Sequence, residues 1–426
     1  MVAKFKRTAI ESLPIGMVLR APISDPNNPQ IKLLTEGTDV SQAFIDKLIA
    51  RGIGEVVVSE RDLAMMQAFR PQGRGKKVPP AHQYVQSVAV NDESKEIDQL
   101  VHDGNILRLD EISSPVSESL EQPSNTAYSD GLQQQWAGDC DEQVETLCEL
   151  FDETCNGNEV SLEPLLQQCE QIITRLKEDS DALVCLAAAP YPAEYPTRHA
   201  FHLASLAIAI GVQVGLDHQN LLDLGVGCLI HDAGMRQVGL EQFEAKTTIS
   251  SVGLQKLADH PVRALEVASR YNGISDNARM VAYQIHERLD GSGYPRGRTA
   301  NQIHDLAKIA AVADAFIGMA TPRPHRLGIQ GYFAIKQILD EMKAGKFDPK
   351  VVRGLLEATS LYPIGSFVQL TNEHVGRVIR TGGADYANPT IEMWKANQLD
   401  AEPAIVNLKE EEDIQIAASI PPPSAA

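Results

Sequence analysis

From about residue 138 to residue 355, large apolar residues recur at intervals of three and four positions. One such series is Leu162, Leu165, Leu166, Cys169, Ile172, Ile173 and Leu176. This spacing places the apolar side chains on one face of an α-helix, and the region holds no convincing run of alternating apolar and polar residues. The sequence therefore predicts a mainly α fold class, with a helical bundle over residues 136–360.

Changes in composition divide the chain ahead of this bundle. Residues 1–70 are predicted to form a small α+β module, in which Ser41 begins a helical pattern, Gly52 ends it, and a strand follows at residues 55–58. Residues 71–135 are rich in glycine, proline, serine and scattered charges, as in PQGRGKKVPP. Such a segment buries too little apolar surface to offset its ordering entropy, which indicates a largely disordered linker. A long functional loop is the alternative interpretation.

The chain changes character again after residue 360. The turn signal Tyr362-Pro363-Ile364-Gly365 precedes SFVQL and VGRVIR, which together are typical of a β hairpin. Residues 390–394 are predicted to add a third strand. We therefore expect a small β element over residues 361–400 and a tail over residues 401–426, with the terminal IPPPSAA disordered.

Charge, cysteine content and hydropathy restrict the class of protein. The net charge of −19 argues against binding of nucleic-acid polymers, because a phosphate backbone requires a basic surface, whereas a small anion needs only a local arginine cluster. The six cysteines form no C-x-x-C pair, which favours free thiols in a reducing compartment. The longest uncharged apolar run, residues 200–216, is short for a bilayer span, and the N-terminus lacks the apolar core of a signal peptide. A cytoplasmic protein without a membrane segment is expected.

Histidines and aspartates interrupt the apolar helical segments at several places. The candidate metal ligands are His199, His231, Asp232, His260, His286 and Asp314. A buried imidazole or carboxylate needs a partner, and a shared divalent cation could satisfy all of them at once. Taken singly, each is more typical of a hydrogen-bonded core or surface residue, so the hypothesis depends on the set. Imidazole and carboxylate together suit Fe, Mn, Zn or Ni rather than Ca.

Within this set Asp232 is the candidate catalytic residue. Its two carboxylate oxygens could bridge two ions, and two neighbouring ions can activate water and clamp the oxygens of a phosphodiester. This arrangement favours phosphoester hydrolysis. Two other histidines receive structural interpretations: His202, one turn after His199, as an orienting or core residue, and His304 as a structural residue or helix cap.

The string HERLDGSGYP at residues 286–295 makes the pattern specific. Together with YPTRHAFHLA, LIHDAGM and AKIAAVADAFIGMATPRPHR, it resembles the HD-GYP family of bacterial cyclic di-GMP phosphodiesterases over about residues 176–356. The resemblance implies a helical bundle whose metal site is buried near a groove for the dinucleotide. It places His199, His231, Asp232 and Asp314 around one divalent ion, and Asp232, His260 and His286 around a second. Fe or Mn is the expected metal, with Zn or Ni as alternatives.

The same resemblance implies ligand contacts and partners. Arg323 and Arg326 match basic positions that contact the ligand phosphates, where guanidinium groups suit a phosphodiester. The loop that contains Gly293, Tyr294 and Pro295 would shape the groove, although an ordinary tight turn is the alternative. The expected partners are cyclic di-GMP or a related nucleotide, and diguanylate cyclase domains that this loop can contact in the family. An oligomer is compatible with the sequence.

Four positions depart from the family pattern. The family has lysine at Met235, histidine at Ile285, usually aspartate at Ile317 and tyrosine at His325. Methionine cannot supply a charge to a phosphate, and isoleucine cannot bind a metal, so the second ion and the phosphate contacts are weakened. We therefore expect a cyclic di-GMP phosphodiesterase of reduced activity. The alternatives are an inactive domain that acts as a cyclic di-GMP sensor or interaction module, and a phosphohydrolase for another nucleotide, which the intact GYP string disfavours.

Overall fold

The computed structural model describes residues 5–10, 13, 21–26, 31–35, 40, 44, 47–48, 51, 53–59, 88–108, 116–119, 130–189, 195–238, 251–322, 328–395, 398, 401–411 and 413–420. The chain forms two compact units, residues 1–78 with 420–426 and residues 79–419.

The first unit contains a small antiparallel sheet in the order β1-β4-β2-β3. Its strands are β1 (Phe5–Ala9), β2 (Ile23–Ser24), β3 (Lys32–Leu34) and β4 (Glu55–Ser59). Alternate residues of β4, Val56 and Val58, are buried beside Ile23 and Leu48, which is the period-2 pattern of a strand with one covered face. The predicted strand at residues 55–58 is confirmed. The predicted helix boundaries, Ser41 and Gly52, lie outside the described residues.

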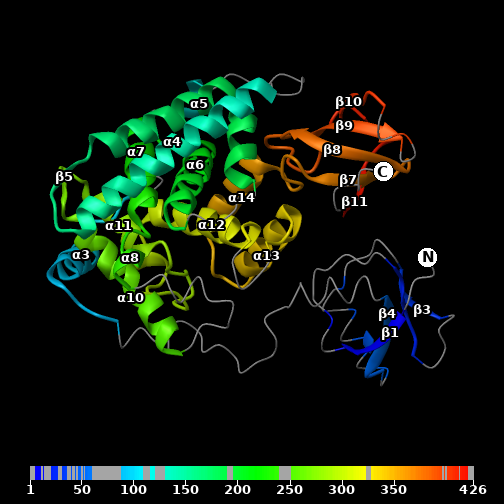
Figure 1. The fold of residues 1–426 in the computed structure, drawn as a ribbon, viewed down its shortest axis with the longest axis horizontal. Helices are drawn as coiled ribbons and strands as arrows, with labels where there is room; N and C mark the ends of the chain where they lie inside the picture. Colours follow the sequence, from blue (N-terminus) through cyan, green and yellow to red (C-terminus); the bar gives the residue numbers. More distant parts are fainter. Residues whose placement is uncertain are drawn as a thin grey trace. The chain divides into compact units, whose positions relative to one another are not determined.

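The second unit is built mainly from helices, which confirms the predicted fold class (Figure 1). In chain order they are α3 (Asp92–His102), α4 (Asp130–Cys155), α5 (Glu163–Ala188), α6 (Thr197–Gln213), α7 (His218–Ile230), α8 (Met235–Val238), α10 (Ser251–Ala268), α11 (Asp276–Gln284), α12 (Asp305–Ala320), α13 (Gly331–Lys343) and α14 (Pro349–Thr359). Short 3-10 helices lie at η5 (Val116–Ser119) and η6 (Ala300–Gln302), and β5 (Val160–Ser161) pairs in parallel with β6 (Tyr271–Asn272).

Helix α6 is the centre of this bundle. It packs against α4, α5, α7, α12 and α14, and every residue from His199 to Val212 is buried. A helix that is apolar on all sides is the core helix of a large domain, which accounts for the long apolar run at residues 200–216. Across the described ranges, none of the helices combines the length and the apolar character needed to cross a membrane.

The structure differs from the predicted linker over residues 88–108. Helix α3 lies there, and it packs against α10 and α11. The Asn91 side chain accepts a hydrogen bond from the backbone N of Ser94, and the Ser94 hydroxyl accepts one from the backbone N of Asn91, so a capping box begins the helix. Ile97 and Val101 are buried at a spacing of four residues. The polar composition of the segment concealed this short amphipathic helix, which is stabilised by its tertiary contacts.

The C-terminal part of the second unit is a five-stranded sheet in the order β10-β9-β8-β7-β11. Its strands are β7 (Phe367–Leu370), β8 (His374–Arg380), β9 (Thr390–Lys395), β10 (Ala404–Asn407) and β11 (Ile416–Ile420). The predicted hairpin and third strand are confirmed. Two strands in the segment expected to be a tail correct that expectation: β10 pairs with β9, and β11 lies beside β7. Their short sequences carry little periodic signal alone and depend on pairing with neighbours.

A kink in α5 joins this sheet to the bundle. Asp179 departs from helical geometry, with φ −157° and ψ 96°, and its side chain accepts a hydrogen bond from the backbone N of Ala182. Arg380, at the end of β8, forms an ion pair with Asp179 at 2.5 Å and lies 3.7 Å from Asp181. Thr381 donates its hydroxyl to Asp181 at 2.9 Å. The side chains of Arg380 and Asp181 are buried and that of Asp179 is 15% exposed, so charged contacts help to fix the sheet to the bundle.

Candidate metal centre

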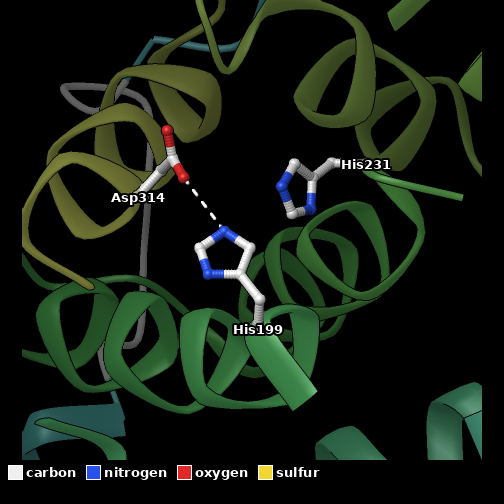
Figure 2. A group of neighbouring side chains, drawn as sticks. All are labelled: His199, His231 and Asp314. Atoms are coloured by element: carbon white, nitrogen blue, oxygen red, sulfur yellow. Dashed lines mark hydrogen bonds and ion pairs between the residues drawn. The ribbon is translucent and has the colours of Figure 1, made fainter. Parts of the chain in front are cut away.

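The predicted ligands come from separate helices and meet in the interior of the bundle. His199 lies in the first turn of α6, His231 and Asp232 follow the end of α7, His260 lies within α10, His286 follows α11, and Asp314 lies in α12. Figure 2 shows His199, His231 and Asp314 pointing toward one another from three elements. The four residues His199, His231, Asp232 and His260 are each at most 2% exposed.

The two carboxylates lie at the centre of the cluster. Asp232 Oδ2 lies 3.2 Å from His231 Nε2 and 4.0 Å from His199 Nε2, and its Oδ1 lies 3.3 Å from His260 Nε2. Asp314 Oδ1 lies 3.1 Å from His199 Nε2, and its Oδ2 lies 3.4 Å from His286 Nδ1. The Nε2 atoms of His260 and His286 are 3.0 Å apart. All six predicted residues are therefore brought into one continuous cluster.

These separations fit divalent cations. An octahedral ion with bonds of about 2.1 Å keeps adjacent donor atoms about 3.0 Å apart. Most of the donor pairs above lie between 3.0 and 3.4 Å. Two overlapping sets have all their donor atoms within 4.8 Å of one another: His199 with His231 and Asp314, and His231 with Asp232 and His286.

The ring orientation of two histidines also fits a metal. The Nδ1–H of His231 donates to the carbonyl of Cys228 at 2.7 Å, and the Nδ1–H of His260 donates to the carbonyl of Leu257 at 2.5 Å. Because a carbonyl only accepts, Nδ1 carries a proton, and Nε2 faces the cluster with a lone pair whenever the ring is neutral. Within the described part of the chain, the buried His231 Nε2 makes no hydrogen bond, although Asp232 Oδ2 lies 3.2 Å away. A divalent cation would satisfy this otherwise costly buried nitrogen.

The charge states match the same chemistry. Burial alone would raise the pKa of Asp232, but His231, His260 and His199 hold the pKa well below its usual value. The pKa of Asp314 is likewise held low, since the hydrogen bonds from His199 and His286 outweigh burial. Burial, and then the neighbouring His286, lower the pKa of His260 to about 3. Ionised carboxylates and the neutral ring of His260 are protonation states that metal binding requires. Burial alone would lower the pKa of His231, but Asp232 raises it, so a metal ion would displace a proton from that ring.

Gly234 permits the close packing that brings Asp232 to His260. A Cβ atom at Gly234 would lie 2.4 Å from the carbonyl oxygen of His260 and 2.6 Å from the backbone N of Ala264. Any larger residue would force the turn after α7 away from α10. The glycine two positions after Asp232 thus positions ligands from two elements.

The loop after His286 folds back over this ligand. The ring of Tyr294 stacks on His286 with 4.8 Å between centroids and 19° between planes. A Cβ at Gly293 would lie 2.4 Å from the backbone N of Arg288, so only glycine fits the return of the chain. Gly293 and Tyr294 therefore lie beside His286.

Sequence reasoning missed Glu287, which fixes this loop. Its buried carboxylate accepts hydrogen bonds from the backbone N of Arg296 at 2.7 Å and of Arg298 at 2.9 Å. Burial raises the pKa of Glu287, while these hydrogen bonds and nearby arginines oppose the rise. A carboxylate directly after a candidate ligand and within an apolar surrounding was the available signal.

Three of the four residues that depart from the family pattern are buried. Met235 and Ile285 are 0% exposed and Ile317 is 1% exposed, and both isoleucines belong to the main apolar core. Arg323, His325 and Arg326 lie outside the described residues.

The structural interpretations of two further histidines are confirmed. His202 contacts the carbonyl of Ala187 at 3.0 Å through Nδ1 and is buried. His304 caps α12, because its side chain accepts a hydrogen bond from the backbone N of Leu306.

Comparisons with known proteins agree with this geometry. Residues 165–351 match the family model described as HD domain. A cyclic di-GMP phosphodiesterase of Pseudomonas aeruginosa is 26% identical over 257 residues, which cover 60% of this chain and 61% of the relative. A second cyclic di-GMP phosphodiesterase, from Borreliella burgdorferi, is 24% identical over 47% of this chain and 51% of its own length. A 3′3′-cGAMP-specific phosphodiesterase of Vibrio cholerae is 25% identical over 40% of this chain and 36% of its own length.

The matched region spans less than two thirds of the length of each of these relatives. It includes the helices that carry all six predicted ligands. Residues 165–351 of this chain therefore match an HD domain, and the chain is similar in sequence to cyclic di-GMP phosphodiesterases.

Proposed function

We propose that this protein hydrolyses a phosphodiester bond of cyclic di-GMP with the help of one or two divalent metal ions. The observation that carries the proposal is the buried cluster of four imidazoles and two carboxylates, whose ring nitrogens and carboxylate oxygens face one another at the separations of metal ligands. The names of the relatives in Pseudomonas aeruginosa and Borreliella burgdorferi supply the substrate class.

In this proposal His199, His231, Asp232 and Asp314 hold one ion, and Asp232, His260 and His286 hold the second. Fe or Mn suits these donors best, with Zn or Ni as alternatives. Bound ions would activate water for attack and offset negative charge on the phosphodiester. Arg323 and Arg326 are proposed to contact the phosphates.

The protein's own residues supply the protonation states. Asp232 stays ionised because the surrounding imidazoles hold its pKa low, so it can serve both ions without first losing a proton. Burial raises the pKa of Tyr294 well above its usual value, and its hydroxyl therefore stays protonated beside His286. This hydroxyl is a hydrogen-bond donor that suits an anionic ligand.

A second function is favoured by a specific observation. Met235, Ile285 and Ile317 are buried apolar residues where the family has lysine, histidine and usually aspartate. A domain with these replacements could bind cyclic di-GMP, or a diguanylate cyclase domain through the Gly293-Tyr294-Pro295 loop, without turnover. Assembly into an oligomer is compatible with either function.

Turnover by the full chain distinguishes the two functions. The purified protein, loaded with Mn²⁺ or Fe²⁺, is incubated with cyclic di-GMP and separately with 3′3′-cGAMP, and linear products are followed by chromatography. Metal content is measured on the same samples. Asp232→Ala removes the central carboxylate, and Asp276→Ala removes an exposed carboxylate on α11 as a matched control.

We expect a linear product from cyclic di-GMP that Asp232→Ala abolishes and Asp276→Ala leaves unchanged. If the protein cleaved 3′3′-cGAMP but not cyclic di-GMP, the proposed substrate would be wrong and 3′3′-cGAMP would replace it. A metal-loaded wild-type protein that forms no product from either nucleotide would reject the enzyme and leave the binding function.

A further inference from the structure

We infer that Asp98 of α3 is a positioning residue of the metal centre. It holds the loop of residues 290–299 through Arg296 and Arg298, and this loop stacks Tyr294 on His286. The inference rests on the proposed role of His286 as a metal ligand. It assigns a function in the site to a helix in the segment that the sequence suggested was a linker.

Asp98 forms two ion pairs with the loop. Its Oδ2 accepts a hydrogen bond from Arg296 Nε at 3.1 Å, and its Oδ1 accepts one from Arg298 Nη2. The side chains of Arg296 and Arg298 are 16% and 9% exposed, and that of Asp98 is 30% exposed. One carboxylate therefore neutralises two largely buried guanidinium groups, which would otherwise carry a substantial desolvation penalty.

The same two arginines are held from the other side by Glu287. Their backbone N–H groups donate to its carboxylate, while their side chains donate to Asp98. Residues 296 and 298 are two positions apart, so both can bridge the same pair of carboxylates. The loop is thus fixed between α3 and the residue that directly follows His286.

Tyr294 lies between the arginines of this loop and His286. It precedes Arg296 by two residues, and its backbone N donates to the carbonyl of His286 at 3.2 Å. Its ring also lies 6.0 Å from that of His260. A shift of Arg296 would therefore move an aromatic ring that contacts two proposed ligands of the second ion.

Helix α3 is anchored independently of Asp98. Asn91 donates to Glu266 at 3.0 Å, the backbone N of Ala89 donates to Asp259 at 2.9 Å, and Glu96 accepts from Arg279 at 2.7 Å. Ile97 is buried in an apolar cluster with residues of α10 and α11. Arg296 also donates to the carbonyl of Ala89 and the hydroxyl of Ser94, each at 3.3 Å. A substitution at Asp98 should therefore loosen the loop without freeing it completely, while the helix stays in place.

The experiment compares the full-length wild type with Asp98→Asn and with a matched control, Glu96→Gln. Both variants neutralise a carboxylate of α3 that pairs with arginine, but only Asp98 contacts the loop. Deuterium exchange of the amides of residues 290–299 reports the order of the loop. Titration with Mn²⁺, followed by the electron paramagnetic resonance signal of the free ion, reports the metal affinity.

We expect Asp98→Asn to speed amide exchange of the loop about tenfold and to weaken the weaker Mn²⁺ site by at most about fivefold, the loss expected when the stack of Tyr294 on His286 is no longer held. Glu96→Gln should change neither quantity. Asp98→Glu retains the charge and should recover most of the loop protection and most of the Mn²⁺ affinity. If Asp98 had a role in global stability alone, Asp98→Asn would leave the Mn²⁺ affinity unchanged.

Equal loop exchange and Mn²⁺ affinity in Asp98→Asn and wild type would overturn the inference, as would equal effects of both substitutions. If Asp98→Asn does not fold, Arg298→Lys, which keeps the charge but loses the planar donor group, replaces it with the same expected changes. Both measurements are made without substrate. A lack of turnover would therefore reject the proposed hydrolysis without affecting this result.

Discussion

His260 donates its Nδ1–H to the carbonyl oxygen of Leu257, 2.5 Å away. Pro261 lies four residues after Leu257 within α10, and proline has no N–H to complete the helical hydrogen bond to that carbonyl. His231 uses a similar acceptor, the carbonyl of Cys228 in the last turn of α7, where helical carbonyls lack partners. Interrupted helices thus supply the acceptors that orient two proposed metal ligands.

Replacement of Pro261 by alanine should therefore affect metal binding and stability in opposite directions. The N–H of the new residue would compete for the carbonyl of Leu257, and His260 would lose its fixed ring orientation. We expect Mn²⁺ affinity to fall about tenfold. The free energy of unfolding of the metal-free protein should rise by about 1–3 kcal/mol, because proline in a helix interior is unfavourable.

Mn²⁺ titration and urea unfolding of the metal-free protein measure the two effects. Pro349→Ala is the matched control, since Pro349 occupies the first turn of α14, where proline is tolerated. It should leave the Mn²⁺ affinity unchanged. A Pro261→Ala protein with wild-type affinity would contradict the proposed origin of the His260 orientation.

Tyr294 should contribute to metal binding through its ring. A stacked aromatic pair contributes about 1 kcal/mol, which corresponds to roughly fivefold in affinity. We expect Tyr294→Ala to weaken Mn²⁺ binding by about this factor, and Tyr294→Phe, which keeps the ring, to retain wild-type affinity. Equal losses in both variants, measured by Mn²⁺ titration, would show that the hydroxyl and not the stack is responsible.

Stability should fall in acid because of His304. Burial lowers its pKa from 6.5 to about 4, its Nε2 pairs with Asn277 at 3.1 Å, and its Nδ1 accepts from the backbone N of Leu306. The folded protein then binds fewer protons than the unfolded chain between pH 6.5 and 4. The stability from neutral His304 is complete above pH 6.5 and is lost as the pH falls toward 4, by about 3 kcal/mol in total.

Urea unfolding of the metal-free protein between pH 7.5 and 4.5 measures this loss. His304→Asn keeps a good helix cap but cannot titrate, so it should reduce the pH slope in this window by about 1.4 kcal/mol per pH unit. An unchanged slope would exclude His304 as the titrating group. Burial also lowers the pKa of His202 to about 4. Protonation of His202 should therefore cause a similar loss of stability in acid, independent of His304.

The ion pairs at the kink in α5 should be essential for docking of the C-terminal sheet. Arg380→Ala leaves Asp179 and Asp181 without their buried guanidinium, and we expect a loss of about 3 kcal/mol in the free energy of unfolding. Arg377→Ala, on the same strand, removes a half-exposed ion pair with Glu392. It should change the free energy of unfolding by less than about 1 kcal/mol. Similar losses in both variants would contradict this assignment.

The effect of Arg380→Ala should also depend on pH. Burial raises the pKa of Asp181 to about 6, while the Thr381 hydrogen bonds and the charge of Arg380 hold it down. A carboxylate with a raised pKa lowers stability when it is ionised, that is, as the pH rises from 3.8 through the folded value. Without Arg380 the folded pKa rises further, so urea unfolding should show a larger loss at pH 8 than at pH 5.5.

The candidate ligands could be recognised in the sequence because their signals are local. His231, Asp232, His260 and Asp314 each interrupt an apolar helical segment, and His286 begins the HERLDGSGYP string. Helical periodicity depends on neighbours three and four residues apart, so the bundle also follows from short windows of sequence. The structure places all six residues in one cluster.

Contacts between residues far apart in the sequence could not be predicted from short windows of sequence. Asp98 meets Arg298 from 200 residues away, and Arg380 meets Asp179 across 201 residues. Strands β10 and β11 likewise exist only through pairing with neighbours in the sheet. No local pattern distinguishes these charges and short apolar runs from those of a solvated segment.

The sequence by itself therefore determined the helical class, the six candidate ligands and the positions where family residues are replaced. Only the tertiary structure decided that α3 holds the loop beside His286, that Glu287 fixes it, and that Leu257 orients His260. The physical reason is that side-chain identity and periodicity are encoded locally. The partner of a buried charge or carbonyl is set by which helices pack together.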